Sequence, residues 1–402
     1  MANPDEAARG LNLYDPAFTA DPHALWRQLR EGCPVAHSEE HGGYWILTRY
    51  HDIVSAANNT AVFSSRSVTV PRDLGGDATA EQPPITLDPP RHIDFRRLLL
   101  PGFSSRKVGD YRPAMERLAR AAIATFIADG QCDAALDYAR AIPVGVICPL
   151  FGVPAAMESQ FRQWAEQLNS SSDMRAAAAA AEEMAAYLES ELDARRTDPR
   201  DDIITLVLHS RINGEPLSRA EMLGGLVLIL IAGLDTVWNV LSNTLLYLAG
   251  APADRRRLAG DPALIPAAVE EFLRYFAPAS PARVSTAEAC LDGTVIEADA
   301  SVMLALPSAN RDAAVFERPE DVLLDRRPNK HLAFGVGPHR CIGAPLARLE
   351  LEVALTEWLA AIPEFELRAG AAIDYSSGQV WGPHSVPVVF PARRASGDAF
   401  NA

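Results

Sequence analysis

The sequence predicts a mostly helical α+β fold with a small, mainly antiparallel sheet region. Eight segments carry apolar residues at spacings of three and four, which places them on one face of a helix. Five shorter segments have the alternating, β-branched character of strands. Apolar residues make up 48% of the 402 positions and charged residues 22%. This balance is typical of a soluble globular protein with a large core.

Helices are predicted over eight ranges, in chain order 22–32, 51–58, 111–128, 157–169, 175–196, 218–250, 262–275 and 344–361. The longest apolar run, MLGGLVLILIAGL, lies inside the sixth and ends at Asp235. It is shorter than the roughly 20 residues that span a bilayer. We therefore expect a buried helix and no membrane contact.

Strands are predicted at 44–49, 283–286, 294–296, 302–306 and 386–390. A long loop rich in proline and glycine is predicted over 70–90, and such loops are usually functional. Residues 169–173 (NSSSD) separate two helices and offer a cap for the second. The last residues, 392–402, are predicted to form a flexible tail. By length alone the chain fits two or three domains, or one large one.

Charge and cysteine content exclude several classes of protein. The 37 basic against 52 acidic residues give a formal charge of −15, which argues against nucleic acid or anionic membrane as the main partner. The five cysteines are scattered and form no CxxC pair, so neither a disulfide framework nor a zinc cluster is indicated. The acidic N-terminus lacks the layout of a signal peptide. A cytoplasmic location follows as an expectation.

Residues 334–343, FGVGPHRCIG, place a cysteine where the last predicted long helix begins. The free N–H groups and the positive end of that helix favour a thiolate at Cys341. Gly335 and Gly337 allow the loop to lie flat against a large planar group, with Phe334 packing beneath it. A thiolate presented in this way suits a haem iron. An inert buried cysteine and a phosphate-binding loop are the alternatives, although no Lys-Ser/Thr pair follows the glycines.

The signature Phe334-x-x-Gly337-x-x-x-Cys341-x-Gly343 resembles the haem-binding motif of the cytochrome P450 family of haem-thiolate monooxygenases. Two further motifs agree with the resemblance, in the order that the family shows. Glu271-Phe272-Leu273-Arg274 is similar to its E-x-x-R motif, and the segment 232–236, AGLDT, is similar to its oxygen-activating motif. The resemblance covers essentially the whole chain and is nearest to soluble bacterial, camphor-hydroxylase-like members.

The resemblance implies a single cytochrome P450 haem domain over 1–402, with haem b buried between the helix of Asp235 and the helix that follows Cys341. It implies monooxygenation of a small or medium-sized apolar substrate, with O2 as cosubstrate. Cys341 would be the axial ligand of the iron. The other implied haem contacts are His92, Arg96, Arg283, His339, Phe334, Gly335, Gly343 and Ala232.

The resemblance also assigns roles to residues away from the cysteine loop. Glu271 and Arg274 share a helix face and would be buried with Arg326, fixing the loop. By itself such a pair is more often a weak surface ion pair. Asp235 and Thr236 would deliver protons, with Gly233 letting the helix open. The substrate pocket would be lined by Ile85, Leu228, Ile231, Ala279, Pro281, Gln379 and Val380.

Trp238 lies on another face of the same helix and is expected in the core. Two departures from the family pattern stand out. Leu323 replaces an aspartate that bacterial relatives often carry, and the loop 70–90 offers no tyrosine to anchor a ketone like that of camphor.

Electrons would come from outside, since no flavin or iron–sulfur motif is present. The resemblance implies that the donor is a small [2Fe-2S] or similar ferredoxin, whose reductase uses NAD(P)H. It also implies that the protein itself is a monomer. A basic docking patch near Cys341 would comprise Arg106, Lys107, Lys330, Arg340 and Arg348. Two alternatives remain open at this point: a peroxide-driven haem-thiolate peroxygenase and a non-catalytic haem-based ligand binder or sensor.

Overall fold

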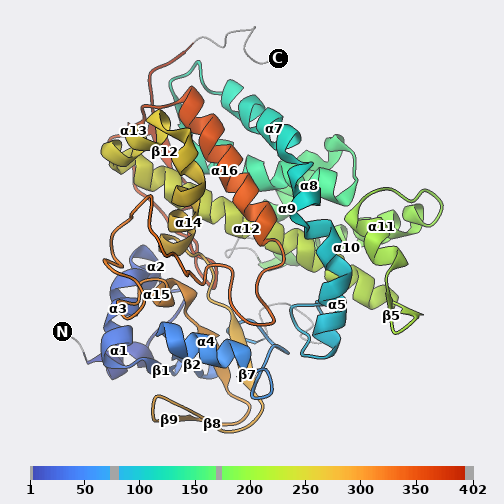
Figure 1. Cartoon of the computed structure of the whole chain (residues 1–402), viewed down its shortest axis with the longest axis vertical. Helices are drawn as coiled ribbons and strands as arrows, with labels where there is room; N and C mark the ends of the chain where they lie inside the picture. The colour runs from blue at the N-terminus through green and yellow to red at the C-terminus, as the bar shows by residue number, and fades with distance from the viewer. Residues whose placement is uncertain (1–2, 73–80, 169–173, 394–402) are drawn as a thin grey trace.

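Helices form most of the molecule. The computed structural model describes residues 3–72, 81–168 and 174–393 (Figure 1). Its α-helices are α1 (Pro4–Arg9), α2 (Pro16–Ala20), α3 (Pro22–Gly32), α4 (Tyr50–Asn58), α5 (Arg91–Leu99), α6 (Ser105–Gly109), α7 (Arg112–Ala124), α8 (Ala141–Phe151), α9 (Glu158–Leu168), α10 (Met174–Arg195), α11 (Ile203–His209), α12 (Arg219–Gly250), α13 (Pro252–Gly260), α14 (Ile265–Tyr275), α15 (Leu306–Ala309) and α16 (Ala344–Ala361).

The sheets are small, and the largest has five strands in the order β1-β2-β10-β7-β3. Only the β10–β2 pair in it is parallel. This sheet lies beside α1 and α4 at one side of the molecule (Figure 1). The strands are β1 (Val35–Ser38), β2 (Tyr44–Leu47), β3 (Phe63–Ser64), β4 (Gln131–Asp133), β5 (Arg211–Ile212), β6 (Glu215–Pro216), β7 (Ala282–Ser285), β8 (Ala289–Leu291), β9 (Thr294–Ile296), β10 (Ser301–Leu304), β11 (Glu366–Leu367) and β12 (Pro387–Val389). The predicted α+β fold is confirmed.

All eight predicted helices are present, and α3 and α16 have the predicted limits. The segment 262–275 divides into a 3-10 turn (Pro262–Leu264) followed by α14. Helix α8 was not predicted because it is apolar on nearly every side and buried, so it shows no amphipathic period. The capping segment 169–173 and most of the tail, 394–402, lie outside the described residues.

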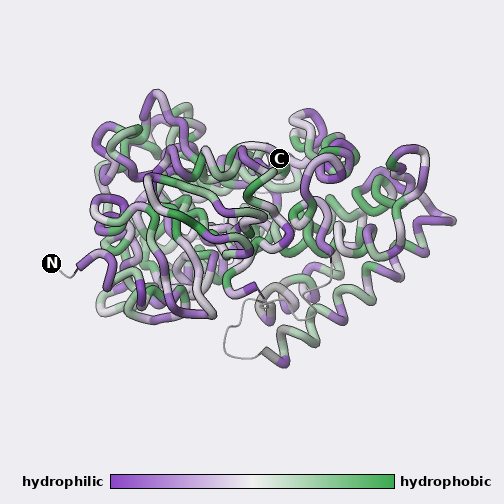
Figure 2. Tube along the Cα trace, turned by 90° about the horizontal axis from the view of Figure 1, so that it is seen from below, coloured by the Kyte–Doolittle hydropathy of each residue, from purple (hydrophilic) through white to green (hydrophobic). Residues whose placement is uncertain are grey.

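The long helices α12 and α16 take part in both helical parts of the core. The first half of α12, including Leu226 and Leu230, packs with α8, α10 and α11, whereas its second half, including Leu241 and Leu245, packs with α14 and α16. Trp238 is 7% exposed, as expected for a core residue. Figure 2 shows the hydrophobic stretches gathered towards the inside and the hydrophilic ones at turns and outer rims. The site described next is built on these two helices.

Helix α12 begins at a capping box in which Ser218 and Glu221 satisfy each other's backbone N–H groups. Two apolar helical stretches, Ala134–Phe151 and α12, have the length and composition to cross a membrane. Both pack against several other helices of the same chain, and core helices of soluble proteins commonly have this composition. The sequence-based argument considered only the uninterrupted apolar run, which is much shorter than the helix that contains it.

Candidate functional site

The cysteine loop connects the segment after β10 to the start of α16. Gly335 and Gly337 have φ angles of 67° and 74°, in the left-handed region that favours glycine. A Cβ atom on Gly337 would lie 2.8 Å from the Ala57 carbonyl oxygen of α4, so this position also requires close backbone approach. The Cys341 N–H donates to the Phe334 carbonyl at 2.7 Å and closes the loop. The loop therefore presents Cys341 just before Gly343, the N-cap of α16.

The surroundings of the Cys341 thiol act in opposite directions on its pKa. The backbone N–H groups of Gly343 and Ala344 and the charges of Arg96 and Arg340 lower it, as expected at a helix start. Burial raises it and outweighs them, so the pKa lies above its ordinary value. Some Cys341 surface is nonetheless exposed.

Four basic side chains from three segments meet beside this loop. The rings of His92 and His339 lie 3.9 Å apart between centroids, and the charges of Arg96 and Arg283 act on both. Burial and this mutual repulsion lower the pKa of His339 to about 3, and burial lowers the pKa of Arg283 to about 10. Ser65, which sequence reasoning missed, contacts the His339 ring at 3.0 Å.

The basic cluster has the unused hydrogen-bonding capacity of an anion site. His92 Nδ1 and Arg283 Nε are buried and have no hydrogen-bond partner among the described residues. Such groups are costly unless a ligand satisfies them. Haem carries two carboxylates, so these donors fit the propionates. Ile231 and Ala232 also have exposed surface in the middle of α12, as expected of residues against which an apolar macrocycle packs. The residues present therefore fit a haem with Cys341 as its ligand.

Asp235 and Thr236 lie in the middle of α12, which is helical throughout from Arg219 to Gly250. Burial raises the pKa of Asp235 to about 6, and a hydrogen bond from Asn239 Nδ2 at 2.9 Å offsets part of that rise. Thr236 Oγ1 donates to the Ala232 carbonyl at 3.2 Å. Gly233 leaves space for the Ile147 side chain, which would lie 3.3 Å from an added Cβ. A carboxyl of this pKa exchanges protons near neutral pH.

The raised pKa of Asp235 makes the stability of the protein depend on pH. Because the folded pKa lies above the ordinary 3.8, ionisation disfavours the folded state, and stability should fall as pH rises from about 4 to about 6. Between pH 4 and pH 7, the free energy of unfolding of Asp235→Asn should therefore rise by about 1–3 kcal/mol relative to that of the wild type. Urea unfolding at both pH values tests this, with the exposed Asp193→Asn as control. Equal pH dependence in wild type and Asp235→Asn would contradict it.

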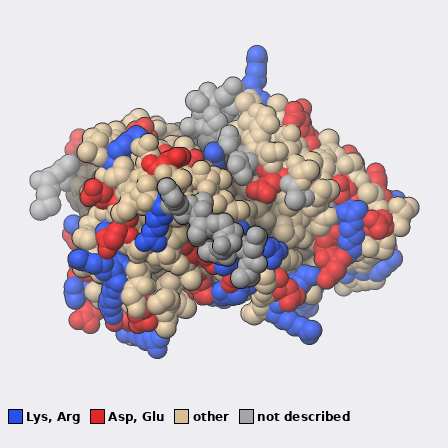
Figure 3. Space-filling view, turned by 90° about the horizontal axis from the view of Figure 1, so that it is seen from above, with Lys and Arg blue, Asp and Glu red and all other residues tan. Residues whose placement is uncertain are grey.

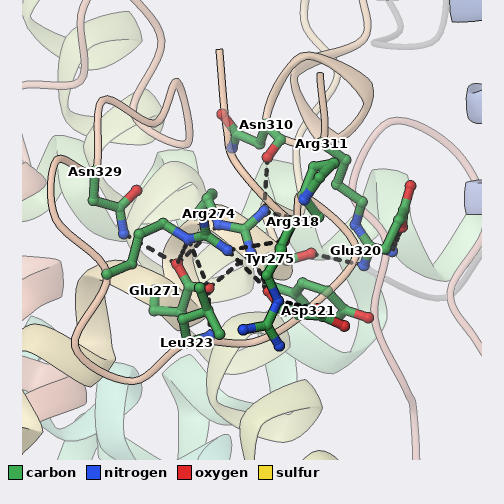
Figure 4. Close-up of polar contacts among 12 residues, drawn as sticks. Glu271, Arg274, Tyr275, Asn310, Arg311, Arg318, Glu320, Asp321, Leu323 and Asn329 are labelled. Atoms are coloured by element: carbon green, nitrogen blue, oxygen red, sulfur yellow. Dashed lines mark hydrogen bonds and ion pairs between the residues drawn. The ribbon is translucent and has the colours of Figure 1, made fainter. Parts of the chain in front are cut away.

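Glu271 is the centre of a buried polar cluster that anchors the segment before the cysteine loop (Figure 4). It accepts two hydrogen bonds from Arg274, at 2.8 and 2.7 Å, and its Oε2 lies 2.9 Å from Arg326 Nε. The exposed fractions of the three side chains are 0%, 0% and 5%. Arg326 rather than the exposed Arg327 is thus the partner. Leu323 stands where bacterial relatives often carry an aspartate. Its main-chain N–H donates to Glu271 at 2.8 Å, so this position joins the cluster through its main chain.

Both arginines of this cluster also bind main-chain oxygens of the surrounding segment. Arg274 donates to the carbonyls of Asn310, Pro319 and Asp321, and Arg326 donates to those of Glu317, Arg318 and Asp321. With Glu271 they tie α14 to residues 310–326. This segment leads directly into the cysteine loop.

A second anchor was not predicted. Arg348 of α16 makes a bidentate ion pair with Glu270 of α14, at 2.6 and 2.9 Å, and lies 4.6 Å above the Phe334 ring. His331 contacts the same carboxylate at 3.2 Å. Glu270 precedes the E-x-x-R motif by one residue, and only its neighbour Glu271 belongs to a recognisable pattern.

The expected docking patch is thus only partly free. Arg348 is held by Glu270, and Lys107 pairs with Asp201 at 2.6 Å. Arg106, Lys330 and Arg340 are exposed. Figure 3 shows basic and acidic side chains interspersed over the face that it draws.

Of the predicted substrate-pocket residues, Leu228 and Ile231 lie on α12, and Ile85 lies in the turn before α5. Ala279 and Val380 face each other in an isolated β-bridge. Pro281 accepts a hydrogen bond from Leu304 N–H at 2.8 Å. The Gln379 amide is committed to the main chain: Nε2 donates to Val68 and Ser280, and Oε1 accepts from Val70 N–H. Gln379 therefore links segments rather than offering a polar group to a ligand.

Known proteins share this architecture and sequence. Residues 263–368 match the family model for Cytochrome P450. The chain is 35% identical over 392 residues to the Vitamin D(3) 25-hydroxylase of Pseudonocardia autotrophica, covering 96% of this chain and 97% of the relative. It is 33% identical to the Mycinamicin IV hydroxylase/epoxidase of Micromonospora griseorubida, covering 92% of this chain and 97% of the relative. The crystal structure of CYP101J2 superposes with a TM-score of 0.87 at 30% identity, covering 95% and 96% of the two chains.

The chain belongs to the cytochrome P450 family. Its relatives are named as hydroxylases, epoxidases and monooxygenases, and this protein is a P450 monooxygenase. Its cofactor is haem b, its cosubstrate is O2, and its electrons come from redox partners. The recognised family and fold are confirmed.

Proposed function

We propose that Cys341 is the axial ligand of the haem iron and that His92, Arg96, Arg283 and His339 bind the propionates. The observation that carries this assignment is that Arg96 lies close to both parts of the site. Its charge acts on the Cys341 thiol and also on the rings of His92 and His339. One basic side chain thus connects the ligand to the anion site. Phe334, Gly335, Gly343 and Ala232 would complete the contact with the macrocycle.

When bound, the haem supplies the oxygen chemistry: one atom of O2 enters a C–H bond of the substrate and the other leaves as water, using two electrons and two protons. The protein's own part is to move protons. Asp235, with a pKa of about 6, holds a proton that can be replaced from solvent. Thr236 Oγ1 passes this proton toward the haem side of α12. Its hydroxyl becomes free to do so when its hydrogen bond to the Ala232 carbonyl breaks. Gly233, which lies against the Ile147 side chain, would let α12 open slightly at this point.

Thr236→Ala should lower the ratio of product formed to NAD(P)H consumed by about tenfold or more, with peroxide released instead, because the last proton donor is lost. Thr244→Ala is the matched control. Thr244 lies two turns later in α12 and its hydroxyl also donates to the carbonyl four residues back, at 2.8 Å. The measurement is product and peroxide per NAD(P)H with a reconstituted ferredoxin and reductase. A Thr236→Ala enzyme as well coupled as Thr244→Ala would contradict the proton role.

The substrate is proposed to be a small or medium-sized apolar organic molecule. The predicted lining is apolar except for Gln379, and the amide of Gln379 is bound to the main chain. Relatives named for vitamin D(3) and steroid oxidation support an apolar substrate. A screen for compounds that displace the water ligand of the iron, read by absorption, tests this proposal. Hits confined to charged molecules would overturn it.

The electron donor is proposed to be a small ferredoxin of the [2Fe-2S] or a similar type, docking near Cys341 on Arg106, Lys330 and Arg340, which are exposed. A cytoplasmic monomer is also proposed. Residues 1–402 would form one haem domain with 392–402 as its tail, and the sharing of α12 and α16 between both helical cores supports a single domain. Turnover driven by peroxide alone, without ferredoxin, would favour a peroxygenase instead.

A further inference from the structure

A surface cavity of about 450 Å³ lies between α3, the second half of α12, the end of α14 and the segment 375–381. None of the residues assigned above to the haem, the proton path or the substrate pocket lines it. The lining comprises Asp21, His23, Ala24, Arg27, Asn243, Leu246, Tyr247, Tyr275, Phe276, Arg311, Glu320, Tyr375 and Trp381. This volume accommodates a small organic molecule.

The walls of the cavity are unusually aromatic and planar. The rings of Tyr375 and Trp381 are stacked, with centroids 4.8 Å apart and planes 5° from parallel. The His23 ring meets Trp381 edge-on at 5.3 Å. The Arg311 guanidinium carbon lies over the Tyr275 ring, 3.8 Å from its centroid. Rigid flat faces of this kind favour a planar aromatic ligand, which gains from stacking and edge contacts.

The polar groups of the cavity are not all used by the protein. Both ring nitrogens of His23 and the Nε of Arg311 are buried and find no hydrogen-bond partner among the residues that the structure describes. Burial and the charges of Arg311, Arg30 and Arg27 lower the pKa of His23 well below its ordinary value, so the ring is neutral. A neutral imidazole has one donor and one acceptor nitrogen. A hydroxyl or an amide on a ligand can therefore bond either nitrogen, by donating to the acceptor or by accepting from the donor.

The charges of the lining balance. Arg27 and Arg311 both contact Glu320, at 3.1 and 3.2 Å, and Asp21 supplies the second acid. Figure 4 shows Arg311 and Glu320 side by side at the edge of the Glu271 cluster. Two basic and two acidic groups leave no net charge to attract an ion. A neutral ligand therefore fits better than a carboxylate or an amine.

We propose that this cavity binds a neutral, planar aromatic molecule carrying a hydroxyl or amide group at its edge, packed against Tyr375 and Trp381 and hydrogen-bonded to His23. The site is separate from the monooxygenase reaction.

The test uses the holoenzyme with n-octylamine bound to the haem iron, so that the haem site is blocked by a ligand that is neither planar nor aromatic. Titration calorimetry with 2-naphthol at pH 7 should still show one binding site. His23→Phe keeps the ring against Trp381 but removes both nitrogens, and it should weaken binding tenfold or more. Because those nitrogens have no protein partner, His23→Phe should unfold at the same temperature as the wild type or higher.

Ala24→Trp should abolish 2-naphthol binding, because Ala24 is exposed at the cavity and an indole there would fill it. The control is Ala121→Trp, at an exposed position of α7 outside the lining, which should bind 2-naphthol normally. Loss of binding once n-octylamine is present, or unchanged affinity in both His23→Phe and Ala24→Trp, would overturn the proposal. Equal or tighter binding of 2-naphthoate would overturn its preference for a neutral ligand.

Discussion

Glu271→Gln should lower the free energy of unfolding by about 3–5 kcal/mol and weaken haem retention. The substitution leaves the guanidinium groups of Arg274 and Arg326 buried without a counter-ion, and removing one partner of a buried ion pair costs that much. The loss should extend to the cysteine loop because Arg326 lies in the segment that leads into it. Urea unfolding followed by circular dichroism and by haem absorbance measures both effects.

Asp325→Asn is the matched control for Glu271→Gln. Asp325 also pairs with an arginine, Arg257, at 2.6 Å, but the two side chains are 60% and 49% exposed. An exposed pair of this kind is screened by solvent and contributes little to stability. If both substitutions cost the same, the Glu271 cluster is not what holds the segment in place.

Cys341→His should abolish the strongly red-shifted Soret band that thiolate-ligated haem shows when reduced under carbon monoxide, and turnover should fall below detection. Imidazole is a neutral ligand that cannot supply the electron density of a thiolate. The measurement is the reduced carbon monoxide spectrum of wild type and variant, with haem content determined in each.

Cys290→Ser controls for loss of a thiol elsewhere, because Cys290 is exposed in β8. It should leave the band unchanged. A red-shifted band that persists in Cys341→His would mean that another residue ligates the iron. The assignments built on the cysteine loop would then have to be abandoned.

The sequence predicted the amphipathic helices well, because one apolar face against solvent leaves a regular pattern. Helix α8 left none, since it is buried on nearly all sides. Short strands such as β3 and β11 were missed because two residues carry no period. Their pairing with distant strands, which no local pattern reveals, is what defines them.

Motifs with fixed spacing gave the centre of the site, whereas contacts between distant segments were less visible. The structure places Arg326 against Glu271, the residue that the resemblance implied as its partner. The bidentate pair of Arg348 and Glu270 was not expected, and Arg348 was instead expected at a docking surface. Gln379 was placed in the pocket from the resemblance, whereas the hydrogen bonds by which its amide joins the segments of Val68 and Ser280 are contacts that the sequence does not reveal. The pKa of Cys341 depended on a balance between burial and the helix start that the sequence cannot supply.

The way in which Glu271, Arg274 and Arg326 hold their surroundings also bears on evolvability. They reach positions 317–323 almost entirely through five main-chain groups: four carbonyls, which every residue type provides, and one N–H, which only proline lacks. A saturation library over this segment should therefore accept most side chains at Leu323, where only proline would delete the N–H that binds Glu271. As long as Glu271, Arg274 and Arg326 are kept, the segment around them could change in sequence without losing its shape.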